Sequence, residues 1–147
     1  IARIKISDTY TVKGWPMVTG VNEEFYAKPD AGQLIVSPAD ETATNPHDAW
    51  PTEEDLATGI DFLSQIAEIS VDRITSSWAG LRTFSPDKAL VIGHDKINSK
   101  FFWFAGQGGY GFQTSAAASE LASELILGIS PSIGRDVSGS LSPSRFY

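Results

Sequence analysis

The chain has 147 residues, of which 41% are hydrophobic, 11% aromatic and 20% charged, and this composition excludes a disordered polypeptide. Its formal net charge of −7 argues against nucleic acid or an anionic membrane surface as a partner, because both require a basic surplus. The absence of cysteine excludes disulfides, thiolate metal sites and a cysteine nucleophile, and two histidines do not support a His-rich metal site.

The sequence shows neither of the patterns that direct a chain to a membrane or out of the cell. No apolar run approaches the ~20 residues that a membrane-spanning helix needs. The chain begins with Ile1 in an alternating pattern, not with a basic segment followed by an apolar core. We therefore expect no membrane span, no bound metal and a cytoplasmic location.

The first half of the chain predicts a hairpin sheet followed by a helix. Alternation over residues 1–6 indicates a strand, and residues 24–28 and 33–37 indicate two more strands joined by a turn at 29–32. Residues 38–51 are polar and contain proline, which is typical of a loop. Thr52 precedes three acidic residues and can cap a helix with Asp55 in a capping-box arrangement, so a helix is predicted over residues 53–69.

The second half predicts three short strands and one more helix. The strand candidates are residues 76–84, 89–93 and 101–105, and the helix covers residues 114–127 and ends at Gly128. Strand-rich stretches separated by two helices predict an α/β protein of the mixed α+β kind.

A glycine-rich loop lies between the last predicted strand and this helix. Gly106, Gly108 and Gly111 match the pattern G-x-G-x-x-G of dinucleotide-binding loops. No strand follows the helix, however, so the complete βαβ unit that such a site requires is missing. Two interpretations stay open. The loop and helix N-terminus can bind an anionic or electron-rich ligand, or the glycines serve only the dihedral angles of a tight connection.

Two side chains outside this loop are candidates for ligand binding. Arg82 lies among apolar neighbours in a predicted strand, where its guanidinium could bind a carboxylate with two hydrogen bonds or pair with a surface acid. Tyr26 could donate its phenol to a ligand or be a half-buried strand residue. The histidines, His47 and His94, lie in polar loops, and no catalytic side chain or metal ligand is assigned.

Six blocks carry a family resemblance, which covers nearly the whole chain in the family's order. They are Trp15–Met17, Phe25–Gly32, Ser37–Ala39, Ser77–Phe84, Phe102–Thr114 and Leu141–Phe146. With these blocks the chain resembles the C-terminal part of the FAD-dependent D-amino-acid oxidase and sarcosine oxidase superfamily. The branch of bacterial D-arginine dehydrogenase and glycine oxidase looks nearest.

The resemblance implies the C-terminal portion of a two-domain flavoenzyme. One domain has a Rossmann-like FAD fold, and the other has a mixed, largely antiparallel sheet that binds substrate. Residues 1–75 would belong to the substrate-binding domain and residues 76–147 to the FAD-binding domain. The family's N-terminal FAD fingerprint would precede Ile1, so the N-terminal half of the same protein is the expected partner.

The resemblance also implies roles for individual residues. Arg82 matches an arginine that clamps the substrate carboxylate, Tyr26 matches a tyrosine that hydrogen-bonds it, and Gly109 matches a position whose backbone faces the substrate amine. A second carboxylate-binding arginine would lie just upstream of Ile1. The implied flavin-contacting positions are Gly80, Gly108, Gly109, Tyr110, Gly111, Phe112 and Gln113. The cysteine that attaches flavin covalently in some sarcosine oxidases has no counterpart, which implies non-covalent FAD.

The implied reaction is oxidation of the C–N bond of a D-amino acid or related amine by hydride transfer to flavin, giving an imino acid. The substrate, and the choice between an oxidase and a dehydrogenase, stay open. The isolated chain is expected to be inactive. The alternative is a stand-alone α+β module that binds a ligand without redox activity.

Overall fold

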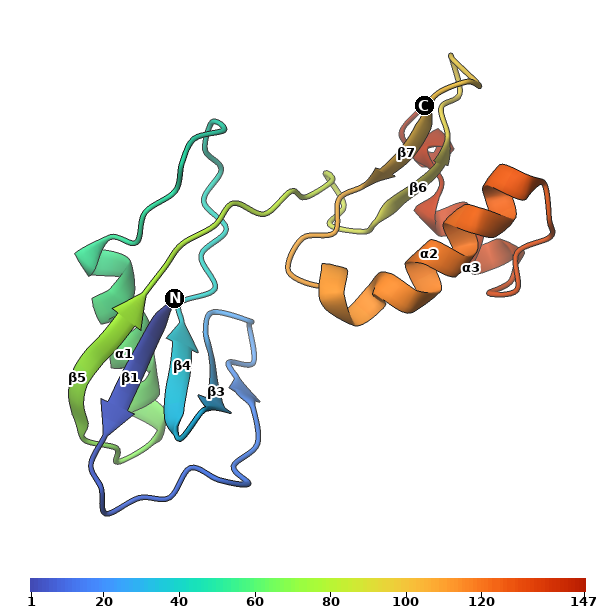
Figure 1. The fold of residues 1–147 in the computed structure, drawn as a ribbon. Helices are drawn as coiled ribbons and strands as arrows, with labels where there is room; N and C mark the ends of the chain where they lie inside the picture. Colours follow the sequence, from blue (N-terminus) through green and yellow to red (C-terminus); the bar gives the residue numbers. More distant parts are fainter. The chain divides into compact units, whose positions relative to one another are not determined.

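The computed structural model describes residues 1–147, which form two compact units, Ile1–Leu81 and Arg82–Tyr147 (Figure 1). The division falls six residues later than the expected boundary after residue 75, because strand β5 (Val71–Ser77) belongs to the sheet of the first unit. The assignment of the two units to a substrate-binding and an FAD-binding domain stays a prediction.

The first unit contains a five-stranded antiparallel sheet in the order β2-β3-β4-β1-β5. The other strands are β1 (Ala2–Ile6), β2 (Val18–Thr19), β3 (Tyr26–Asp30) and β4 (Gln33–Ser37). The strand at the start of the chain and the β3–β4 hairpin were both predicted, and the two-residue strand β2 was not. The hairpin turn is narrower than predicted: Pro29 and Asp30 stay in β3, and Ala31 and Gly32, with φ of 47° and 78°, make the turn.

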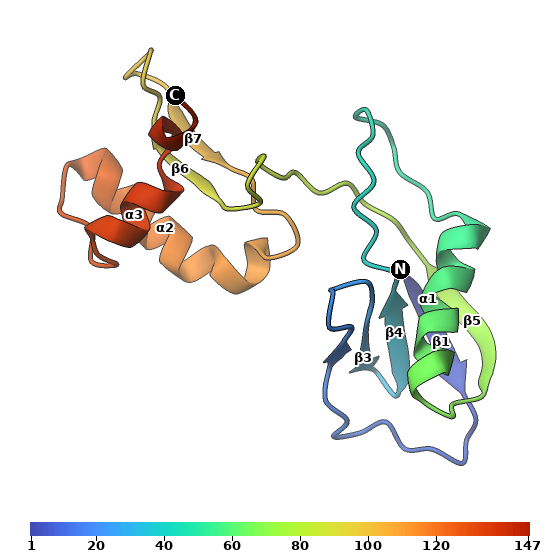
Figure 2. The same ribbon diagram turned by 180° about the vertical axis from the view of Figure 1, so that it is seen from behind.

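Helix α1 (Glu53–Ile66) covers one face of this sheet (Figure 2). The core between them contains Ile4, Val36 and Leu63, each at most 2% exposed. Thr52 caps the helix as predicted, since its hydroxyl oxygen accepts from the Asp55 amide at 3.1 Å. Asp55 accepts from the Thr52 hydroxyl at 2.7 Å and not from its amide, so only half of the capping box forms.

The second unit packs a helix on a two-stranded antiparallel sheet. The sheet pairs β6 (Val91–His94) with β7 (Phe102–Ala105), and helix α2 (Gly111–Leu127) packs on it through a core that includes Ile92 and Leu121. A short helix, α3 (Arg135–Leu141), and a 3₁₀ turn (Pro143–Phe146) complete the unit. Both were missed, because the serine- and glycine-rich sequence of this segment lacks an apolar helical stripe.

The strand predicted over residues 76–84 is wrong beyond Ser77. The amide of Trp78 donates to the carbonyl of Ile1 at 3.1 Å, and the residues that follow pair with no strand. A strand needs a neighbour for its backbone groups, so the chain leaves the sheet there. Arg82 consequently lies in an irregular segment.

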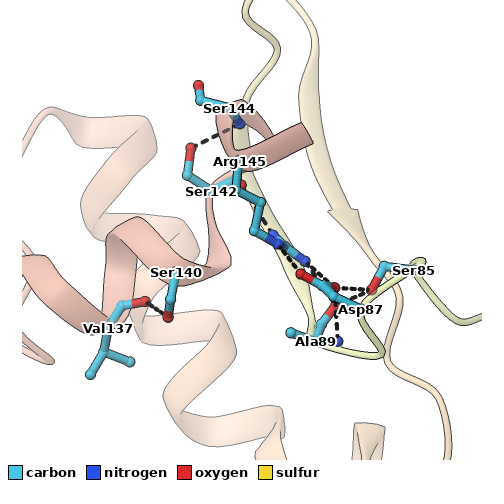
Figure 3. A network of polar contacts seen from close by, with 8 residues as sticks. All are labelled: Ser85, Asp87, Ala89, Val137, Ser140, Ser142, Ser144 and Arg145. Carbon is cyan, nitrogen blue, oxygen red and sulfur yellow. Dashed lines mark hydrogen bonds and ion pairs between the residues drawn. The ribbon is translucent and has the colours of Figure 1, made fainter. Parts of the chain in front are cut away.

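The C-terminal turn is fastened to the segment that precedes β6 (Figure 3). Arg145 donates from Nε and Nη2 to the Asp87 carboxylate at 2.7 and 3.0 Å and from Nη2 to the carbonyl of Ala89 at 3.1 Å. Ser85 donates to Asp87 at 2.8 Å. These donors hold the pKa of Asp87 well below its usual range, with Arg145 as the main cause.

A second carboxylate ties the β6–β7 loop to the C-terminus. Asp95 accepts from the indole of Trp103 at 3.0 Å, from the phenol of Tyr147 at 3.0 Å, and from the amides of Ile97 and Asn98. These hydrogen bonds, that of Trp103 first, lower the pKa of Asp95 to about 2. The charged form of the carboxylate is therefore favoured in the folded state.

The two carboxylates predict acid sensitivity of the second unit. Their folded-state pKa values lie below the ~3.9 of an unfolded aspartate, so their stabilisation is complete above that pH and is lost as the pH falls toward 2. We expect the free energy of unfolding from urea titrations to fall over this range. Asp95→Asn should flatten the decline, and Asp48→Asn, in an exposed loop, should not. A decline equally steep in Asp95→Asn would contradict this account.

Ile92 is 0% exposed in the core of the second unit. We therefore expect that shortening its side chain strongly lowers the stability of this unit. Ile92→Ala should lower the free energy of unfolding by about 2–5 kcal/mol, because the lost methyl groups leave a cavity that packing fills only in part. Ile97, 83% exposed in the β6–β7 loop, offers a matched control. Ile97→Ala should stay within about 0.5 kcal/mol of the parent chain in the same urea titration.

Candidate functional site

The glycine-rich loop connects β7 to α2 in the second unit. The amide of Tyr110 donates to the carbonyl of Gln107, and the amide of Gly108 donates across to the carbonyl of Thr83, both at 2.9 Å. Gly108 has a φ of +51°. The loop is therefore tied both to itself and to the irregular segment that contains Arg82.

The loop ends at the N-terminus of α2, three residues before the predicted start. Tyr110 occupies the N-cap position without a side-chain capping bond, and the helical ladder begins with the amide of Thr114 donating to Tyr110. The amides of Gly111, Phe112 and Gln113 therefore lack intrahelical acceptors. They present donors at the positive end of the helix dipole, an arrangement that suits an anionic or electron-rich group.

Arg82 lies against this loop, although it is distant in sequence. Its Nη1 is 3.3 Å from the position that a β-carbon on Gly109 would occupy. Its guanidinium carbon lies 5.1 Å from the centre of the Phe84 ring. Gly109 is exposed. The structure thus brings together one of the predicted substrate residues and the predicted flavin-contacting loop, even though the strand expected to position Arg82 does not form.

Sequence reasoning missed Phe84 as part of this site. A β-carbon on Gly108 would lie 2.6 Å from Cε1 of the Phe84 ring, so this ring approaches the loop backbone as closely as glycine permits. The sequence offered no specific signal for it, because an aromatic residue two positions from an arginine is common and residues 82–84 do not form a strand. We call Arg82, Phe84, Gly108 and Gly109 the arginine–glycine site.

Among the predicted site residues, Arg82 and residues 108–113 lie in the second unit. Tyr26 and Gly80 belong to the first unit. Tyr26 is half-buried on β3 and pairs with Ser37 of β4. Gly80 follows β5, and a β-carbon there would meet no atom within 4 Å. No neighbour within the described residues therefore explains why this position is glycine.

The sequence also did not single out Arg3, an arginine of the first unit. Arg3 on β1 forms an ion pair with Asp30 on β3, and its guanidinium lies 5.7 Å from the centre of the Trp78 ring. Its Nε is buried without a hydrogen-bond partner. The alternation of β1 directs Arg3 away from the face that α1 covers, because the neighbouring Ala2 and Ile4 lie in the core.

The structure offers little support for other kinds of site. No group of three or more His, Cys, Asp or Glu side chains is arranged to hold a metal ion. No helix is both long and apolar enough to cross a membrane. An apolar cavity of about 360 Å³ in the first unit is lined by residues that include Trp15, Leu63 and Ile69 and holds no functional candidate named above.

An uncapped helix N-terminus, next to a loop in which an exposed glycine lies against an arginine, is an arrangement suited to an electron-rich or anionic ligand. Comparison with known proteins identifies the family of this chain. Residues 3–125 match the family model described as FAD dependent oxidoreductase, and the chain belongs to that family. The predicted superfamily is thereby confirmed, and the cofactor of the family is FAD.

A solved structure supports the fold. The crystal structure of L-proline dehydrogenase from P. horikoshii superposes with a TM-score of 0.74 at 24% sequence identity. The match covers 99% of this chain and 38% of that protein, so the chain spans well under half of the relative's length. The predicted mixed α/β fold of a family flavoenzyme is confirmed. The proposed nearness to D-arginine dehydrogenase and glycine oxidase is not.

The donor set of the second unit fits a flavin. The ring system of FAD carries carbonyl and ring-nitrogen acceptors along one edge, which need N–H donors. The first turn of α2 presents such donors from Gly111, Phe112 and Gln113, and no side chain caps them. The residues present are therefore suited to hold this part of the cofactor.

Proposed function

We propose that this chain is part of an FAD-dependent oxidoreductase that oxidises the C–N bond of a D-amino acid or a related amine. The observation that carries the proposal is the position of the Arg82 guanidinium beside exposed Gly109, at the uncapped N-terminus of α2. This position supports the proposal, because a guanidinium that could anchor a carboxylate lies next to N–H donors that could bind flavin. Membership of the FAD dependent oxidoreductase family supports this reading.

In the proposed site, the loop and the first turn of α2 hold FAD without a covalent bond. The contacts come from Gly108, Gly109, Tyr110, Gly111, Phe112 and Gln113, with Gly80 from the first unit. The positive end of the α2 dipole would stabilise the negative charge that reduction places on the flavin ring. The cofactor supplies the redox chemistry by accepting a hydride from the substrate α-carbon.

The substrate would be held by its carboxylate and its amine. Arg82 offers a planar pair of N–H donors, Tyr26 offers its phenol, and the backbone of Gly109 faces the amine. The α-carbon loses a hydride and the amine a proton, and the resulting imino acid is hydrolysed by water. No protein side chain is assigned as a base, because the lone pair of a neutral amine can assist departure of the hydride. The residues therefore act by orienting the substrate.

The partner in this proposal is the remaining part of the same protein. The chain spans 38% of the length of the matched dehydrogenase. Large apolar side chains are exposed in the second unit, among them Phe112 at 101%, Leu127 at 71% and Ile126 at 59%. A stand-alone binding module would bury such side chains, so these exposures favour a chain that packs against further polypeptide.

The role of Arg82 is tested by Arg82→Lys in the complete, FAD-loaded protein. Lysine keeps the charge but cannot form the two parallel hydrogen bonds to a carboxylate. Loss of a hydrogen bond to a charged group costs about 1.5–3 kcal/mol, so we expect KM for the amino-acid substrate to rise about 10- to 100-fold. Steady-state kinetics measure the change. Arg135→Lys, on α3, is the control, and an unchanged KM in Arg82→Lys would remove the carboxylate role.

The dependence on a partner is tested with the isolated 147-residue chain. We expect the purified chain to retain no flavin absorbance after gel filtration with FAD and to show no turnover of amino acids. The physical reason is that only part of the cofactor would be contacted by this chain. Addition of the remaining polypeptide of the same protein should restore both signals. Stable flavin binding together with turnover by the chain alone would sink this prediction.

A further inference from the structure

We propose that Phe84 is a positioning residue that holds the Arg82 guanidinium at a fixed place relative to the glycine-rich loop. The inference rests on the proposed function of Arg82 as the carboxylate anchor. Phe84 touches neither substrate nor cofactor in this scheme. Its ring acts on the reaction only through Arg82 and the loop backbone.

The first contact is between the ring and the guanidinium. The guanidinium carbon of Arg82 lies 5.1 Å from the ring centre of Phe84, within the range of a cation–π interaction. Arg82 is exposed, whereas Phe84 is half-buried. An arginine side chain has many rotamers, and contact with the half-buried ring reduces their number before substrate binds.

The second contact is between the ring and the loop. Two ring atoms of Phe84, Cε1 and Cδ1, lie 2.6 and 3.0 Å from the β-carbon position of Gly108. The amide of Gly108 also donates to Thr83, the residue between Arg82 and Phe84. Consecutive residues 82–84 therefore each meet the loop, and a shift of the ring would move the anchor and the loop relative to each other.

Packing in the hydrophobic core does not account for Phe84. The buried cluster of the second unit contains Ile92, Ala118, Leu121 and Ala122, with Leu90, Phe102, Leu125 and Leu141 packed against it. Phe84 is not a member of this cluster. Phe84 does contact both Arg82 and the glycine-rich loop, which is the arrangement expected of a residue that positions one relative to the other.

The first test compares Phe84→Leu and Phe84→Tyr in the complete, FAD-loaded protein. Leucine keeps an apolar side chain but has no ring face, so KM should rise about 5- to 10-fold, while kcat changes less than 2-fold. Tyrosine keeps the ring and should restore KM to within 2-fold of the parent. Equal KM values in the parent and Phe84→Leu, or equal defects in both variants, would overturn the proposal.

The proposal and the proposed function can fail separately. If Arg82→Lys raises KM and Phe84→Leu does not, the positioning role is wrong and the carboxylate anchor stands. If Arg82→Lys has no effect, the anchor is wrong. A measurement that needs no substrate and no variant then tests the ring contact: the guanidinium protons of Arg82 should be shifted upfield in the NMR spectrum by the ring current of Phe84. Their appearance at the position of an exposed arginine would contradict the contact.

A double-mutant cycle tests the contact between Phe84 and Gly108. Gly108→Ala introduces a β-carbon where the ring lies, and we expect it to lower Tm and raise KM. Both effects should be smaller when the ring is already replaced by Phe84→Leu, because the clash is then relieved. Gly139→Ala, at a position with no atom within 4 Å, is the control and should combine additively with Phe84→Leu. Additive behaviour of Gly108→Ala as well would refute the coupling.

Discussion

The close approach of residues 82–84 to the glycine-rich loop is the constraint on which the second unit's site depends. The amide of Gly108 reaches the carbonyl of Thr83 at 2.9 Å, and the Phe84 ring fills the space where a side chain on Gly108 would stand. Helix α2 begins at Gly111, immediately after this loop, so the same contacts hold the segment that leads into its first turn. The Arg82 guanidinium and the glycine-rich loop that leads into α2 are thus held in one local framework.

The segment that carries Arg82 is fixed at its other end as well. Ser85, Asp87 and Ala89 are bound together by the hydroxyl of Ser85 and the guanidinium of Arg145. A β-carbon on Gly106 would lie 3.3 Å from the carbonyl of Ala89 and 3.6 Å from the side chain of Ser85. The loop and the C-terminal turn therefore hold one short irregular segment between them, and this explains how Arg82 can be positioned without belonging to a strand.

The sequence predicted those parts of the fold that depend on local patterns. Alternation identified the strand at residues 2–6, turn residues identified the β3–β4 hairpin, and Thr52 identified the start of α1. It failed where the structure depends on a distant partner. Residues 78–84 carry strand-forming side chains but have no strand to pair with, and α2 begins earlier than its composition indicates because Gly111 resembles a loop residue.

The sequence likewise predicted only some of the residues of the candidate site. Arg82 and the glycines stood out by residue type, and the family resemblance supplied their expected roles. Phe84 could not be identified, since an aromatic residue near an arginine becomes informative only when the glycine that it touches is known. The pairing of Arg3 with Asp30 likewise depends on the order of strands β3, β4 and β1, which alternation does not specify.

The glycine pattern itself now has a physical explanation that differs from a dinucleotide fingerprint. Side chains at Gly106, Gly108 and Gly111 would meet Ala89, Phe84 and Gln107 respectively, all within this protein. Packing therefore disfavours a side chain at each of the three glycines that match G-x-G-x-x-G, most strongly at Gly108, and any ligand contact they make must use backbone atoms. Gly109 lies outside the pattern, is exposed, and faces only the guanidinium of Arg82. Of the four glycines in this loop, Gly109 is the most open to a ligand, and it occupies a position that G-x-G-x-x-G leaves unspecified. The motif alone therefore does not identify it.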